Sequence, residues 1–110
     1  MAVRYLSKDV IPAAGVETDL YEVPEATTAL VGSLRVTNAN STSSELNVTL
    51  YPEGGATPHP LLRDYSLPVR GTMDVFSGTT VVFQAGDVLK IESSENSVAF
   101  HLSYMEVDRS

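Results

Sequence analysis

The sequence contains no cysteine and no tryptophan, and each absence narrows the function classes open to the chain. Without cysteine there are no disulfides, no thiolate ligands for zinc and no thiol nucleophile. The two histidines, His59 and His101, are too few for a three-ligand catalytic zinc site without help from carboxylates. We therefore expect no metal centre. Three phenylalanines and five tyrosines supply little of the aromatic lining that a sugar-hydrolase cleft normally uses.

Motifs of catalysis and of cofactor binding are also missing. The chain has no GxSxG nucleophile elbow, no P-loop and no GxGxxG turn, so we expect no cofactor. Carboxylates are numerous, as in any acidic protein, and counting them does not identify a glycosidase pair. The dense acids Glu17, Asp19, Glu22 and Glu25 match the spacing of no calcium loop. We interpret them as a solvated face, with a divalent-cation site as the alternative, and we predict that the protein is not an enzyme.

Positive charge is scarce, with seven Lys and Arg against fourteen Asp and Glu and a formal net charge of −7. The basic residues are scattered along the chain, whereas binding to a phosphate backbone needs them clustered, so nucleic acid is not an expected partner. The longest apolar runs are too short to cross a bilayer, and residues 1–15 contain no apolar core of signal-peptide length. We expect a protein made in the cytoplasm and not held in a membrane.

What the sequence does contain is a period-two alternation of apolar and polar residues, which is typical of half-buried strands. Residues 28–51 (TALVGSLRVTNANSTSSELNVTLY) fit two strands joined by a polar turn at 38–44. We predict that they form the central hairpin of the fold. The residues predicted to share one face are Leu30, Leu34 and Val36 in the first arm and Leu46, Val48 and Leu50 in the second.

The rest of the chain shows further strands, and we find no segment with a helical period. In the first of them Leu20 and Val16 share a face that we expect to point inward. Gly86 is predicted to supply the positive φ of a tight turn, in which Asp87 accepts backbone N–H groups. With seven or eight strands at intervals of about ten residues, we predict an all-β fold, a single antiparallel β-sandwich over residues 16–110, jelly-roll or immunoglobulin-like. The further predicted strands are 16–23, 61–69, 72–76, 79–83, 88–93 and 98–107.

Two irregular segments are candidate contacts with a partner. Residues 1–15 form an N-terminal arm, which is either an edge strand of its own domain or a strand that crosses to a neighbouring subunit. Residues 52–60 (PEGGATPHP) form the longest stretch without periodicity, either a plain surface connection or a contact loop. The candidate contact residues of the two segments are Val3, Arg4, Tyr5, Leu6, Pro52, Pro58, His59 and Pro60.

Four segments carry a resemblance to a known family. They are LYEVP at 20–24, LRVTN at 34–38, AGDV at 85–88, and FHLS at 100–103 with the later Glu106. In this order they are similar to a group of small β-sandwich proteins of tailed bacteriophages and prophages that are taken as virion structural components. The resemblance covers residues 16–107. Members of the family often continue Val-Pro with Ala-Gly, and here Glu25 and Ala26 stand at that place.

The resemblance implies a non-enzymatic role in the virion. It favours a capsid decoration (cement) protein that binds the assembled shell, with the major capsid protein or other virion proteins as partners and a homo-oligomer, preferably a trimer, as its state. A tail, baseplate or head-to-tail component is the first alternative. A carbohydrate-binding β-sandwich module is the second, and it would need exposed aromatic rings. The candidate stacking residues are Tyr5, Tyr21, Tyr51 and Tyr65.

Overall fold

The structure, a computed structural model, describes residues 3–55, 57–77 and 79–109. Within these residues the chain forms nine β-strands, one short 3-10 turn and no α-helix, which confirms the predicted all-β class. The strands are β1 (Val3–Val10), β2 (Thr18–Glu22), β3 (Thr27–Asn38), β4 (Ser44–Tyr51), β5 (His59–Leu67), β6 (Thr72–Asp74), β7 (Val81–Phe83), β8 (Val88–Ser93) and β9 (Val98–Asp108), and the 3-10 turn η1 is Pro52–Gly54.

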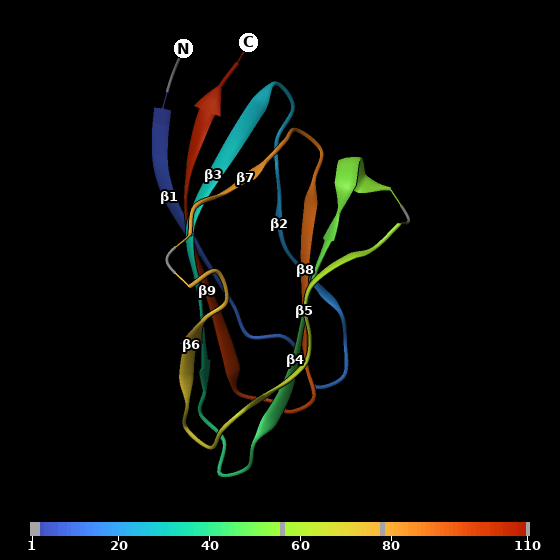
Figure 1. The fold of residues 1–110 in the computed structure, drawn as a ribbon, viewed down its shortest axis with the longest axis vertical. Helices are drawn as coiled ribbons and strands as arrows, with labels where there is room; N and C mark the ends of the chain where they lie inside the picture. The colour runs from blue at the N-terminus through green and yellow to red at the C-terminus, as the bar shows by residue number, and fades with distance from the viewer. Residues whose placement is uncertain (1–2, 56, 78, 110) are drawn as a thin grey trace.

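The strands form two antiparallel sheets that face each other as the layers of a β-sandwich (Figure 1). In the first sheet the order is β1-β9-β3-β6, and β7 also pairs with β3. In the second sheet the order is β2-β8-β4-β5. The last strand of the chain, β9, therefore lies inside the first sheet between β1 and β3, and both ends of the chain lie at the same end of the molecule.

The segment predicted to be a central hairpin is an arch between the two sheets, so that prediction is wrong. β3 belongs to the first sheet and β4 to the second. The buried Asn38 fixes the connection, because its side-chain oxygen accepts the N–H of Asn40 at 3.0 Å and its amide donates to the carbonyl of Thr42 at 2.9 Å. Alternation identified two strands correctly, but both arms can point into one core without pairing with each other.

The core lies between the sheets and is filled by alternate residues of the strands. In β4, Leu46 and Val48 are buried and Leu50 is partly buried against the core, as predicted. Each aliphatic side chain withdrawn from water in this way contributes about 1.5–3 kcal/mol, so the alternating pattern accounts for the closure of the sandwich. The inward face of β9, also predicted, consists of Val98, Phe100, Leu102 and Tyr104.

A bulge in β3 changes which residues face the core. The pairing with β9 shifts between Val31 and Ser33, and Gly32 is the extra residue. Val31 is fully buried as a result, whereas Leu30 is only partly buried and lies on the opposite face. The prediction that Leu30 shares the inward face is wrong, because strict alternation assumes that no residue is inserted into the strand.

The tight turn before β8 agrees with the sequence prediction. Gly86 has a φ of +86°, a conformation that glycine adopts without strain. The carboxylate of Asp87 accepts the backbone N–H of Gln84 at 2.9 Å and that of Glu53 at 3.0 Å. Asp87 thus closes its own turn and also fixes η1 against the start of β8.

The strands at the sheet edges follow the predicted pattern less closely. β2 begins at Thr18, and Leu20 is buried as predicted, but Val16 precedes the strand and is 52% exposed. In β5 only Leu67 is buried. The pairing of β5 with β4 shifts its register twice, so the alternation of β5 does not produce one continuous inward face.

Candidate interaction surfaces

The predicted N-terminal arm is β1, an edge strand of the first sheet that pairs with β9. Val3 and Tyr5 are 48% and 82% exposed, so they point away from the core. Leu6 is partly buried against the core. The guanidinium of Arg4 donates a hydrogen bond to the carboxylate of Glu106 at 2.9 Å. Two of the four candidate contact residues in the arm are therefore available to a partner, and the other two attach the strand.

A buried polar cluster joins the two sheets at the end where β1 begins. Glu106 in β9 is 6% exposed and accepts hydrogen bonds from Arg4 in β1 and, at 2.5 Å, from the hydroxyl of Tyr21 in β2. The Tyr21 ring packs on Tyr104 with 4.4 Å between the ring centroids. Burial, then the hydrogen bond to Glu106, raises the pKa of Tyr21 well above its ordinary value. The carboxylate is paired as a buried charge must be, so the cluster is a structural clasp.

The second predicted contact segment lies along the start of β5. Pro52 begins η1, Pro58 precedes β5, and the exposed His59 and Pro60 are its first residues. Ala56, within the predicted loop, lies outside the described residues. β5 is the edge of the second sheet opposite β2, whereas β1 contacts β2. The structure therefore places the two candidate segments on opposite sides of the sandwich, and their role in binding stays a prediction.

Further exposed apolar residues lie on these two sides, in addition to the predicted contact residues. Along β5 and just after it, Leu61, Tyr65 and Val69 are 40–50% exposed. Beyond β1, Ile11 and Val16 are 66% and 52% exposed. A signal for the first group exists in the sequence, because the alternation of 61–69 places Leu61, Tyr65 and Val69 on the same face as the charged Arg63.

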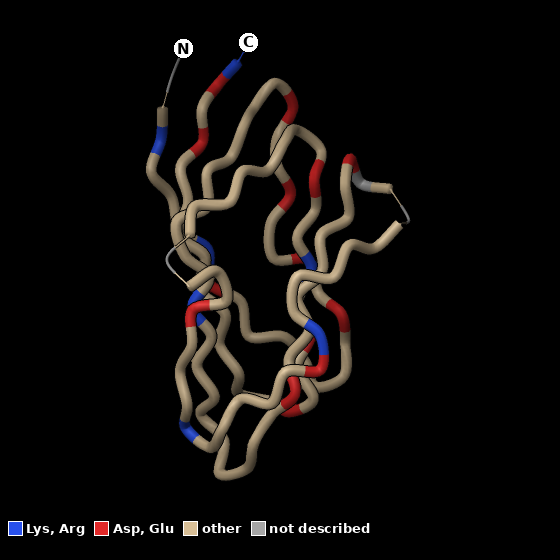
Figure 2. Tube along the Cα trace, viewed as in Figure 1, with Lys and Arg blue, Asp and Glu red and all other residues tan. Residues whose placement is uncertain are grey.

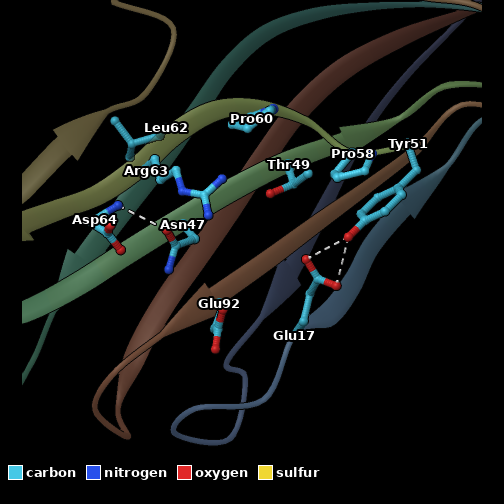
Figure 3. Close-up of a pocket in the computed structure, with 10 residues that line it drawn as sticks. All are labelled: Glu17, Asn47, Thr49, Tyr51, Pro58, Pro60, Leu62, Arg63, Asp64 and Glu92. Carbon is cyan, nitrogen blue, oxygen red and sulfur yellow. Dashed lines mark hydrogen bonds between the residues drawn. The ribbon is translucent and has the colours of Figure 1, made fainter. Parts of the chain in front are cut away.

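A shallow groove of about 250 Å³ lies on the outer face of the second sheet (Figure 3). Its aromatic wall is Tyr51, whose hydroxyl donates to the two carboxylate oxygens of Glu17 at 3.1 and 3.2 Å. The ammonium of Lys90 lies 5.0 Å from the centroid of the same ring. Desolvation, then the Glu17 hydrogen bond, raises the pKa of Tyr51. Other groups that line the groove are Asn47, Thr49, Arg63 and Glu92.

The four tyrosines proposed for carbohydrate stacking do not form a common platform. Tyr21 is 3% exposed and belongs to the core, so its selection as a stacking residue is wrong. Tyr51 is engaged by the ammonium and carboxylate described above. Tyr5 belongs to the first sheet and Tyr65 to the second, so the two exposed rings lie on different sheets.

The charged residues give no further site within the described part of the chain. Figure 2 shows Lys and Arg placed singly along the Cα trace. Asp19, one of the dense acids, pairs with Lys90 at 3.3 Å. In residues 3–55, 57–77 and 79–109, no three His, Asp or Glu side chains are grouped so that they could hold a metal ion. The same residues include no helix long and apolar enough to span a membrane.

No protein-family model matches the chain, and no curated protein matches it. Among solved structures it is similar to two crystal structures of a pentameric capsid protein isolated from metagenomic phage sequences. In both cases the TM-score is 0.40 and the sequence identity 21%, over 91% of this chain. The chain spans 59% and 63% of the length of those two chains.

Proposed function

We propose that the protein is a non-enzymatic structural component of a tailed-phage virion, and specifically a decoration protein that binds the assembled capsid shell. The order of the four resembling segments supports the proposal. These segments lie on β2, on β3, at the turn before β8 and on β9, so they are features of the scaffold. The partners would be the major capsid protein or other virion proteins, and several copies of the chain would associate.

The observation that carries the proposal is the presence of two separate uncovered apolar surfaces. One follows β1 with Val3 and Tyr5, and the other follows β5 with Leu61 and Tyr65. Exposed aromatic side chains such as Tyr5 and Tyr65 are enriched at protein–protein contact sites. A protein that binds its own copies and a shell needs two such surfaces. We assign the β5 side, with the loop before it, to the shell.

Particles of the phage that encodes this protein, prepared from a mutant that lacks its gene, provide the test. The purified protein is added, the particles are sedimented, and the bound copies are located by cryo-electron microscopy. We expect density on the capsid shell. Density on the tail or baseplate alone would replace the decoration role with the tail role, and binding to neither part would refute the virion role.

A pair of variants tests the assigned surface. Tyr65→Ser removes an exposed ring from β5, and we expect it to weaken binding to particles about tenfold, the effect of losing about 1.4 kcal/mol at an interface. Ile11→Ser is the matched control, because Ile11 is 66% exposed after β1, on the opposite side. Equal binding by both variants would refute the assignment of the β5 side.

A glycan array supports the carbohydrate alternative only if the wild-type protein gives specific signals.

A further inference from the structure

The outer face of the first sheet is divided into rows of like residues that run across its strands. Cross-strand partners on β1, β9 and β3 define these rows. The apolar band consists of Val3, Tyr5, Leu30, Met105 and Val107 together with Val82 of β7. Next to it is the serine row, Ser7, Ser103 and Ser33, and beyond that the charged row, Asp9, His101 and Arg35, which continues to Asp74 of β6.

The apolar band contains a hollow of about 460 Å³ beside Gly32. A Cβ added at Gly32 would meet only the carbonyl oxygen of Ser103 at 3.8 Å, an ordinary contact, and its φ is outside the left-handed region. Neither crowding nor backbone conformation therefore requires glycine at position 32. Its presence needs another reason, because glycine in the interior of a strand lowers stability. Glycine in a strand often marks the close approach of another chain or a ligand. The hollow is bordered by Tyr5, Leu30, Thr80 and Met105.

We propose that this face binds the same face of a second copy of the chain, around a two-fold axis that runs along β9. Such an axis places β1 of each copy over β3 of the other and keeps every row over the same row. The most exposed large apolar side chain of the apolar band, Tyr5, then lies over the partner's Leu30, at the hollow beside the partner's Gly32. The contact is reciprocal, and the same axis brings Met105 against the partner's Met105.

The charged row selects this axis among the possible ones. Within one chain Asp9 contacts His101, and in the described residues Arg35 has no carboxylate at ion-pair distance. An axis along β9 places Arg35 over the partner's Asp9, twice by symmetry. An axis between β9 and β3 would instead place Asp9 over the partner's Asp74 and so set two carboxylates together. Opposite charges therefore meet only in the first arrangement.

The size of the face is compatible with a stable contact. Four neighbouring strands at about 4.8 Å and seven residues at about 3.4 Å cover about 19 by 24 Å, or roughly 450 Å² in projection. The relief of the side chains increases the accessible area towards the roughly 800 Å² per partner of a standard interface. A dimer differs from the trimer that the resemblance implies, so the mass of the free protein decides between the two.

Sedimentation velocity of the isolated protein tests the inference. We expect a concentration-dependent species of twice the 11.8 kDa chain mass. Gly32→Arg fills the hollow and should leave only monomer. Arg35→Asp should raise the dimer dissociation constant at least about tenfold, because it sets like charges together twice. The double variant Asp9→Arg/Arg35→Asp should restore the dimer.

Arg63→Asp is the matched control, because it makes the same charge change on β5 of the second sheet and should leave the dimer intact. Circular dichroism and thermal melting confirm that each variant is folded. A wild-type monomer or trimer would overturn the inference, as would a dimer that persists in Gly32→Arg or a double variant that dimerises no more tightly than Arg35→Asp. Because no virus particle is involved, these outcomes are independent of the proposed binding to a shell.

Discussion

Replacing Tyr21 with phenylalanine tests the clasp that joins the two sheets. The variant keeps the ring and its packing on Tyr104, but Glu106 loses a hydrogen bond of 2.5 Å while it remains 6% exposed. Hydrogen bonds to charged groups contribute about 1.5–3 kcal/mol to stability. We therefore expect the free energy of unfolding to fall by about 2 kcal/mol near pH 8, since Arg4 remains as the other donor.

The same variant should change how stability depends on pH. Because the fold raises the pKa of Tyr21 above its ordinary value of 10.0, the unfolded chain loses this proton from about pH 10 upward while the folded chain keeps it. The unfolded state then binds fewer protons, so the stability due to Tyr21 is complete below about pH 10 and is lost at about 1.4 kcal/mol per pH unit above it. Phenylalanine has no proton to lose. The gap between wild type and variant should narrow to about 0.6 kcal/mol near pH 11.

Urea unfolding followed by circular dichroism, at several pH values between about 8 and 11, measures both effects. Tyr65→Phe is the control, because Tyr65 is 43% exposed and the structure gives it no place in the clasp. Its curve should follow that of the wild type throughout. A gap for Tyr21→Phe that stays constant with pH, or that is absent near pH 8, would show that the hydroxyl does not donate to a buried carboxylate.

Three further substitutions address single features of the fold, each measured by urea unfolding at neutral pH. Asp87→Ala should lower stability by about 1–3 kcal/mol, because the N–H groups of Gln84 and Glu53 lose their acceptor; no loss would contradict the turn geometry. Asn38→Ala should cost about 3 kcal/mol through the arch between the sheets, and a value under 1 would refute its importance. Gly32→Ala should raise stability by about 0.5 kcal/mol, because a Cβ fits there; a loss would mean that the hollow is not open.

The last two strands of the chain, β8 and β9, were predictable because local chemistry determines them. The segment 88–93 is β8 as predicted, and the predicted strand 98–107 differs from β9 by one residue. The turn at 84–87 could be predicted from Gly86 and Asp87. Gly86 supplies the positive φ, and the Asp87 carboxylate accepts a backbone N–H within the turn. Features that are satisfied within a few residues can be identified from the sequence alone.

Pairing between distant strands was not predictable in the same way. Alternation shows which side chains leave water, but it does not show whether the next strand joins the same sheet or the opposite one. In the sequence, the arch after β3 therefore cannot be distinguished from a hairpin turn at 38–44. The extra residue at Gly32 reverses the phase of Leu30 and Val31, and only the register with β9 reveals it.

The candidate contact residues show the same division. Tyr5 was selected and is highly exposed, whereas Tyr21 was selected for stacking and is buried in the clasp. A signal for the clasp existed, because Glu106 continues the alternate phase of Phe100, Leu102 and Tyr104 on the inward face of β9. A carboxylate in that phase has to find donors within the protein, and its donors come from strands that no local pattern connects to it.

The central position of β9 in the first sheet has a consequence for how the protein is made. A ribosome delivers β1 and β3 early, but the strand that separates them is the last to emerge. Until then neither has the neighbour that completes its backbone hydrogen bonds, although the strands of the opposite sheet, β2, β4, β5 and β8, have already been made. We therefore expect the first sheet to close only once β9 has left the ribosome, because pairing between strands so distant in sequence is slow. The apolar band on the outer face is complete only then as well, because Met105 and Val107 belong to β9.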